Sequence, residues 1–408
     1  MRRAPGSGQA FAYGTWGAFM LPTTTRGHER REWVIVPVMI PYLPNSIVAA
    51  LALAAVAAGG DGLGYAKPAA AQSALLTKEQ SEAQAAYDRA VREFKAVLSE
   101  RRAQIDAKRP LPERPGQAVY LARVEVMSTY KDLTDAHPLR IGRPNKFGVP
   151  PAYFDVAIEP LIDEYTALFK HMQTPPSYAQ ASETPFKDVA DLGRAIARAK
   201  GLDAATVDAA GRISLGIYFA ETNGNQNIGN ARSTTYKGSL QTGVSEDRKG
   251  RALWEALKAK VAAVDPAVAA RDDQETKRVG SGDQRYNHWT GVRNGLMNAH
   301  ADLFAQIPAI AKMLPDEIDQ MKVFQLIQLI PTPTRAALAS GNFAGYRIAN
   351  PTIMGYLRNN SIFSYGKKDR AKTTATFREI LDGMWLFNDK FVRAKARFAE
   401  VKAEEKKR

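Results

Sequence analysis

The stretch ISLGIYFAETNGNQN, residues 213–227, decides how this chain is interpreted. Its first half is apolar at nearly every position. These apolar residues form the end of a predicted helix, which starts at a capping residue, Asp203 or Thr206. A helix that is apolar on nearly every side is buried in the core of a protein. The sequence therefore predicts a buried helix over residues 203–222 that carries one carboxylate, Glu221, at its C-terminal end.

Glu221 is expected to resist ionisation for two reasons. Apolar surroundings favour the neutral carboxyl, and the negative end of the helix dipole repels the carboxylate. A carboxyl that keeps its proton near neutral pH can act as a general acid for a glycosidic oxygen. Most glutamates at helix ends are ordinary solvated residues, so the pattern that follows Glu221 decides between the two interpretations.

The residues after Glu221 resemble the motifs of the soluble lytic transglycosylases, a family of the lysozyme-like superfamily. Glu221–Asn227 matches that family's Glu-Ser-Gly-Phe-Asn-Pro-Asn block at the glutamate, the neighbouring hydroxyl residue and both asparagines. Gly238–Gln241 is similar to the family's Gly-Leu-Met-Gln, and Tyr286-Asn287 is similar to the Tyr-Asn of its Ala-Tyr-Asn-Ala-Gly motif. The matches follow the family's order and are confined to about residues 210–290.

This resemblance implies an enzyme that cleaves the bond between N-acetylmuramic acid and N-acetylglucosamine in peptidoglycan and forms a 1,6-anhydro product. Glu221 would be the catalytic acid and then the base, without a second catalytic carboxylate. The resemblance also implies a set of residues that bind substrate: Thr222, Asn225, Gln241, Tyr286 and Asn287.

A second stretch of the sequence is also similar to the family's glutamine motif. Leu326–Pro331, followed by Thr334-Arg335, is similar to Leu-Met-Gln-Leu-Met-Pro with its trailing Thr-Ala-Arg. No carboxylate lies about eighteen residues before Gln328, since residue 310 is isoleucine. We therefore assign the motif to Gln241 and expect residues 324–330 to form an amphipathic core helix.

Helical periodicity dominates the rest of the chain. From Thr77 to Lys108 there is no glycine or proline, and apolar residues recur every three or four positions. Further helices are expected at residues 117–136, 154–172, 185–200, 245–264, 284–306, 315–330 and 370–405. Only the polar, glycine-rich segment Asn223–Gly243 carries β-prone residues. The predicted fold class is mostly α.

Two helical regions are expected, separated by a linker near residues 176–184, where Pro175-Pro176 is followed by a run rich in Ser, Thr and Ala. The first is a helical N-terminal region at 72–176. The second, at 184–408, is a lysozyme-like helical domain that contains the short β-containing loop region and the C-terminal helices.

The N-terminal 71 residues predict export. An apolar run at 47–58 is shorter than the roughly 20 residues that span a bilayer, and a basic cluster precedes it. These features are typical of a signal peptide, so we expect residues 1–71 to be an extension and leader removed after Ala71. A membrane anchor is the alternative, and the start codon stays open between Met1 and Met39. The expected location is the periplasm.

Composition narrows the chemistry. The 408 residues include no cysteine, which excludes thiol nucleophiles and thiolate metal sites, and the five histidines share no ligand spacing. No nucleotide-phosphate motif is present, so neither a metal nor a cofactor is expected. The net charge is +14, and it is +11 without residues 1–71. For an exported protein this charge predicts contact with peptidoglycan strands or an anionic envelope surface, and not with nucleic acid.

Two other functions remain open at this point. A non-catalytic periplasmic helical protein would bind envelope components or a protein partner through residues 77–172, and Glu221 would be a plain helix terminus. A true hydrolase of the same superfamily would use Glu246 or Asp247 to activate water. The lytic transglycosylase is the preferred interpretation.

Overall fold

The computed structural model describes residues 76–110, 115–137, 182–224, 226, 235–279 and 283–407. These residues belong to one compact unit, which spans Ser73–Arg408. The expected leader at 1–71, the expected helix at 154–172 and most of the expected linker lie outside the described residues. The division into two helical regions therefore stays a prediction.

The described chain is mostly helical, as expected. Within it, strands are limited to β1 (Arg347–Ile348) and β2 (Ala375–Thr376), which pair antiparallel with Arg347 opposite Thr376. The glycine-rich segment adds one isolated bridge between Lys237 and Thr242. No helix of the described part is long and apolar enough to cross a bilayer.

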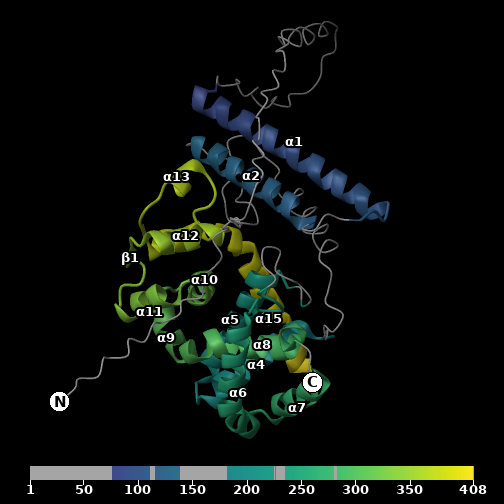
Figure 1. Cartoon of the computed structure of the whole chain (residues 1–408). Coiled ribbons are helices and arrows are strands. Elements are labelled where there is room, and N and C mark those ends of the chain that lie inside the picture. The colour runs from purple at the N-terminus through teal and green to yellow at the C-terminus, as the bar shows by residue number, and fades with distance from the viewer. Residues whose placement is uncertain are drawn as a thin grey trace, which may run out of the picture. The chain divides into compact units, whose positions relative to one another are not determined.

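The first two described helices, α1 (Lys78–Asp106) and α2 (Pro115–Ala136), pack side by side (Figure 1). Thr77 and Gln80 form a reciprocal capping box at the start of α1. The expected apolar stripe is buried at Phe94 and Leu98. One face of α1 therefore forms the contact with α2, as its periodicity predicts.

This helix pair is attached to the C-terminal part of the chain. Tyr365, Trp385 and Leu386 complete the hydrophobic cluster between α1 and α2. Ser128 Oγ on α2 accepts hydrogen bonds from the Gly366 amide at 3.1 Å and from the Arg370 guanidinium at 2.7 Å. The contact therefore combines apolar burial with polar anchoring.

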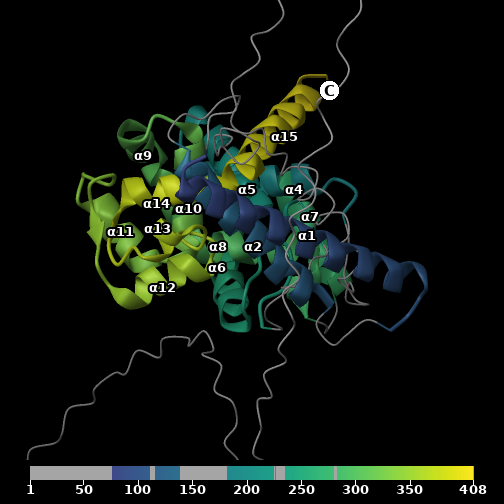
Figure 2. The same ribbon diagram turned by 90° about the horizontal axis from the view of Figure 1, so that it is seen from above.

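Helix α5 (Ala204–Thr222) lies in the main core, as its all-round apolar sequence predicts. Asp203 caps it by accepting a hydrogen bond from the Thr206 amide at 2.9 Å. It contacts α4 (Pro185–Ala199), α10 (Glu317–Leu329) and α15 (Asn388–Lys407), and Figures 1 and 2 both show α15 beside it. A side chain at Gly193 would bring its Cβ to 2.3 Å from Ser214 Oγ, so glycine permits the close approach of α4.

A second group of helices surrounds the buried carboxylate Asp272. It consists of α6 (Val244–Val264), α7 (Pro266–Val279) and α8 (His288–Ala299). The remaining elements are η1 (Gln284–Tyr286), η2 (Ala301–Gln306), α9 (Ile307–Met313), α11 (Pro331–Ala339), α12 (Pro351–Asn359), α13 (Lys367–Arg370), α14 (Phe377–Gly383) and η3 (Trp385–Phe387).

Two expected helices are divided in the structure. The helix expected at 284–306 is broken where Asn287 caps α8, and it ends in the 3-10 helix η2. The helix expected at 370–405 is wrong before Asn388, because Ala375-Thr376 pairs with β1 and η3 separates α14 from α15. Thr376 and Glu379 then form a capping box that starts a new helix, α14.

Candidate functional site

Glu221 lies in the last turn of α5, where the sequence predicts it. The helix ends because Asn223 adopts a left-handed conformation with φ 57°, and Gly224 follows with φ 81°. Residues on both sides of Glu221 are buried, but Glu221 itself is only partly buried. The structure thus confirms a carboxylate at the end of a buried helix.

Two glutamines of α10 bind the Glu221 carboxyl. Gln325 Nε2 donates to Glu221 Oε1 at 2.6 Å, and Gln328 Nε2 donates to the same oxygen at 3.0 Å. Their spacing of three residues places both amides on one face of the helix. No described residue donates a hydrogen bond to Glu221 Oε2. The carboxyl is therefore held through one oxygen.

Gln328 has partners for its whole amide group. Its Nε2 also donates to the backbone oxygen of Leu240 at 3.1 Å, and its Oε1 lies 3.1 Å from His300 Nε2. Two acceptors on the nitrogen side and the histidine on the oxygen side define the orientation of the amide. The polar loop that contains Leu240 is thereby linked to the Glu221 site.

Desolvation raises the pKa of the Glu221 carboxyl to about 7. The Gln325 hydrogen bond and the positive charge of Lys390 act in the opposite direction, and the negative charge of Glu246 adds to the rise. A carboxyl with this pKa is present in both protonation states near neutral pH. It can therefore donate a proton and take one back.

Lys390 of α15 places a positively charged ammonium group near Glu221. Its Nζ donates to the Ala220 backbone oxygen at 2.5 Å, at the negative end of the α5 dipole. Desolvation lowers the pKa of the Lys390 ammonium to about 8, while the charge of Glu221 opposes this shift. The positive charge of Lys390 therefore acts both on the C-terminal end of α5 and on the Glu221 carboxyl.

The residues expected to bind substrate have other contacts in the structure. Thr222 is buried and its hydroxyl donates to the Tyr218 backbone oxygen at 2.7 Å. The Gln241 side chain donates to the Gly238 backbone oxygen at 2.9 Å, and Gln328 contacts Glu221. Asn225 lies outside the described residues. Substrate binding by these three residues stays a prediction.

Tyr286 and Asn287 lie where η1 joins α8. Asn287 is buried, and its side chain caps α8 by accepting from the Thr290 amide at 3.0 Å. Tyr286 is partly buried, and its ring faces Lys237 Nζ at 4.9 Å from the ring centre. The asparagine thus has a structural role, and a role of either residue toward substrate stays a prediction.

The two acids considered for a hydrolase both lie in the first turn of α6. Glu246 accepts a hydrogen bond from the Gly243 amide at 2.7 Å, which is a helix-capping contact. Asp247 is buried and accepts from Asn294 Nδ2 at 2.7 Å. Glu246 therefore caps α6, and Asp247 links α6 to α8.

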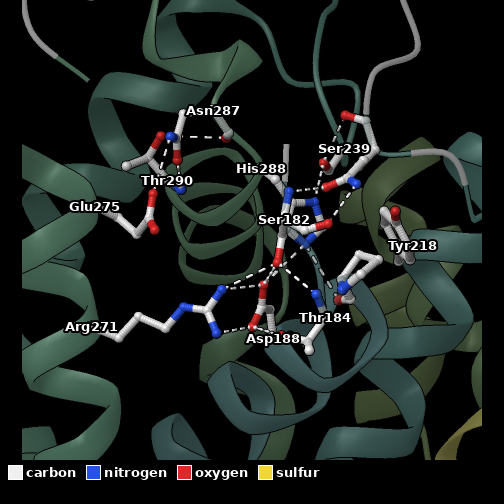
Figure 3. A network of polar contacts seen from close by, with 12 residues as sticks. Ser182, Thr184, Asp188, Tyr218, Ser239, Arg271, Glu275, Asn287, His288 and Thr290 are labelled. Atoms are coloured by element: carbon white, nitrogen blue, oxygen red, sulfur yellow. Dashed lines mark hydrogen bonds and ion pairs between the residues drawn. The ribbon is translucent and has the colours of Figure 1, made fainter. Parts of the chain in front are cut away.

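A separate polar cluster surrounds His288 (Figure 3). Ser239 Oγ lies 2.9 Å from His288 Nδ1, while His288 Nε2 lies 3.3 Å from the Pro185 backbone oxygen and 3.8 Å from an Asp188 oxygen. Burial lowers the pKa of His288 to about 4, so the ring is neutral. Its Nε2–H then faces the carbonyl, and Nδ1 accepts from Ser239. Ser239 and His288 are fully buried, which fits a structural link and not an exposed nucleophile.

Asp188 joins this cluster to the start of α4. It ion-pairs with Arg271 at 2.5 Å and accepts a hydrogen bond from Ser182. Ser182 in turn exchanges backbone hydrogen bonds with the Gln226 side chain. The cluster therefore ties the polar segment after α5 to α4 and α7.

No group of three histidine, aspartate or glutamate residues within the described ranges could hold a metal ion. Comparison with family models, with curated proteins and with solved structures finds no significant match to this chain. Function is therefore inferred from the geometry of the site.

Four residues at the Glu221 site were not predicted from the sequence: Gln325, Gln328, His300 and Lys390. A signal for one of them was present, because the Leu326–Pro331 stretch resembles the family's glutamine motif and contains Gln328. The expected core helix does form, as α10, but two of its polar positions face Glu221. His300 and Lys390 had no comparable pattern.

Proposed function

We propose that this protein is a peptidoglycan lytic transglycosylase in which Glu221 is the catalytic acid and base. One observation carries the proposal. The Glu221 carboxyl has a pKa of about 7, is held through Oε1 and has no hydrogen-bond donor on Oε2 among the described residues. This combination suits a group that must transfer a proton twice in one reaction.

The reaction follows from these properties. Protonated Glu221 donates its proton to the oxygen between N-acetylmuramic acid and N-acetylglucosamine, and the bond to the muramic acid C1 breaks. The resulting carboxylate then takes the proton of the muramic acid 6-hydroxyl while the 6-oxygen bonds to C1. The products are a free 4-hydroxyl on one sugar and a 1,6-anhydro ring on the other, and Glu221 is protonated again.

A single carboxyl is sufficient for this scheme because water is not consumed. That requirement agrees with the structural contacts of Glu246, which caps α6, and of Asp247, which links α6 to α8. The resemblance of the Glu221 block to the soluble lytic transglycosylases adds independent support, and a lysozyme-like fold for residues 184–408 is part of the proposal.

The same proposal includes location and partners. The expected leader would send the chain to the periplasm, where peptidoglycan strands are available. A net charge of +11 after its removal favours attraction to the stem-peptide carboxylates of the wall and to anionic envelope surfaces. The scheme needs neither a metal nor an organic cofactor.

Digestion of purified sacculi, with mass analysis of the soluble products, tests the proposal. We expect muropeptides with 1,6-anhydro ends. Reducing ends would instead indicate a hydrolase. In that case Glu246, whose negative charge acts on Glu221, is the candidate to activate water. Absence of products from a folded protein would favour the non-catalytic binding protein.

A further inference from the structure

The contacts of Glu221 are asymmetric. Gln325 and Gln328 both donate to Oε1, and both are neutral amides on α10. A carboxyl oxygen accepts two hydrogen bonds only if it carries no proton itself, since its two lone pairs are then both used. In the protonated acid, the proton must therefore lie on Oε2.

We infer that Gln325 and Gln328 are positioning residues that reserve Oε2 of Glu221 for the transferable proton, and that His300 acts through Gln328 to hold this arrangement. The inference rests on the proposed role of Glu221 as the acid. It adds three residues to that role, none of which contacts the reacting atoms in the scheme.

The role of His300 follows from the orientation of the Gln328 amide. Gln328 can donate to both Glu221 Oε1 and the Leu240 oxygen only when its nitrogen faces them. Its Oε1 must then accept a hydrogen from His300 Nε2, 3.1 Å away. If the proton were on Nδ1 of His300, two lone pairs would oppose each other, and rotation of the amide would remove the donor from Glu221.

The surroundings of His300 support this tautomer. The ring is fully buried against Phe324, with 6.2 Å between the ring centres, and burial lowers the pKa of His300 to about 4. The ring is therefore neutral at working pH and has a single N–H. Nδ1 has no hydrogen-bond partner among the described residues, which leaves Nε2 as the protonated nitrogen.

The charged groups near Glu221 come from three other helices, and the test keeps them unchanged. Lys390 of α15 and Glu246 of α6 act on Glu221 directly. Arg393 and Asp389 of α15 and Arg123 of α2 act on Lys390. The Gln328 amide is hydrogen-bonded to Glu221, the Leu240 oxygen and His300, so replacing the amide changes these hydrogen bonds and leaves the nearby charges in place.

Variants Gln325→Met and Gln328→Met remove one amide each and keep the length of the side chain. We expect kcat for sacculus digestion to fall about 10- to 100-fold with little change in KM, because a proton on the wrong oxygen is misplaced. The pKa of Glu221 should also rise, since each amide stabilises the carboxylate. Gln320→Met is the matched control, because Gln320 lies on the same helix and donates to the Leu314 oxygen at 3.0 Å.

A double-mutant cycle separates positioning by His300 from packing. His300→Phe keeps an aromatic ring and removes the donor, whereas His300→Gln restores an N–H near the place of Nε2. We expect His300→Phe to lower kcat as Gln328→Met does and His300→Gln to recover most of it. His300→Phe should add nothing in the Gln328→Met background. Additive losses of kcat would overturn the role of His300.

Direct titration of Glu221 keeps this inference distinct from the proposed function. Carbon-13 NMR of labelled glutamate carboxyls, assigned with Glu221→Gln, measures the pKa without substrate. If wild-type protein releases no glycan products, the proposed function fails and the titration still reports on the amide contacts. If digestion proceeds but neither kcat nor the Glu221 pKa differs between Gln328→Met and Gln320→Met, the inference is wrong.

Discussion

Glu221 and Asp272 are two carboxylates in the same compact unit, with opposite surroundings. Asp272 is fully buried and accepts hydrogen bonds from the indole nitrogens of Trp254 and Trp289, each at 3.0 Å. Arg293 forms an ion pair with it. Glu221 is partly buried, and its donors among the described residues are two neutral amides on one oxygen.

This difference in surroundings distinguishes a carboxylate with a structural role, Asp272, from a carboxyl that can transfer a proton, Glu221. Both oxygens of Asp272 have donors, so the residue joins α6, α7 and α8. The amides beside Glu221 compensate burial only in part, and its carboxyl therefore keeps a proton up to about neutral pH. A carboxyl oxygen without a hydrogen-bond donor lowers the stability of the fold, and it leaves a position from which a proton can be transferred.

Replacement of Glu221 by glutamine should have the largest effect on function. The variant keeps the shape of the side chain but has no transferable proton, so glycan cleavage should fall about 10²–10⁴-fold. Release of anhydro muropeptides, with circular dichroism to confirm folding, measures this. Near-normal release by a folded variant would remove Glu221 from the mechanism.

Replacement of Asp272 by asparagine should have the opposite profile. It leaves the buried Arg293 without its counter-charge, and the free energy of unfolding should fall by about 3 kcal/mol. Urea unfolding measures the loss. Cleavage per folded molecule should stay near the wild-type rate, and a selective loss of activity would break the distinction between the two carboxylates.

The stability of wild type relative to Glu221→Gln should depend on pH. Glu221 has a pKa of about 7 in the folded protein and 4.5 as an unperturbed group. Its protonated form therefore stabilises the fold fully below pH 4.5, and this contribution is lost as pH rises through 7. The variant should gain at most about 3 kcal/mol relative to wild type between pH 4 and pH 8. Urea unfolding of both proteins at several pH values tests this, and a constant difference would contradict the raised pKa.

Lys390→Met should shift the pH profile of cleavage. The lysine charge lowers the pKa of Glu221, so its removal should move the alkaline limb of kcat to higher pH by about one unit. Lys402→Met is the control, since Lys402 lies on the same helix and pairs with Asp208 at 3.1 Å. Equal profiles for both variants would show that Lys390 serves only the helix end.

Ionic strength should have the smallest effect on the Glu221 site. Attraction between exposed positive charges and the wall is screened over about 10 Å at about 0.1 M salt, whereas hydrogen bonds from Gln325 and Gln328 act at short range. We expect KM for sacculi to rise with salt while kcat changes little. Sacculus binding that is insensitive to salt would show that the net charge has no part in finding substrate.

Local signals predicted most of the helices. The capping box at Thr77 and the stripe through Phe94 and Leu98 identify α1 without reference to the rest of the fold. Asn350 followed by Pro351 is a comparable start signal for α12, which the periodicity analysis did not identify. The division of the expected 370–405 helix was not predictable locally, because β2 pairs with a strand that precedes it by 27 residues or more.

The candidate site also has a part that the sequence predicted and a part that depends on tertiary packing. The sequence by itself determined that Glu221 ends a buried helix, because apolar spacing, the Asp203 cap and the Asn223-Gly224 stop all act within a few residues. Only the tertiary structure decided which groups hold the carboxyl. Gln325 and Gln328 follow Glu221 by 104 and 107 residues, and Lys390 follows Ala220 by 170. Their distances to the carboxyl and its helix end depend on how α5, α10 and α15 pack, and side-chain packing across helices leaves no fixed spacing in the sequence.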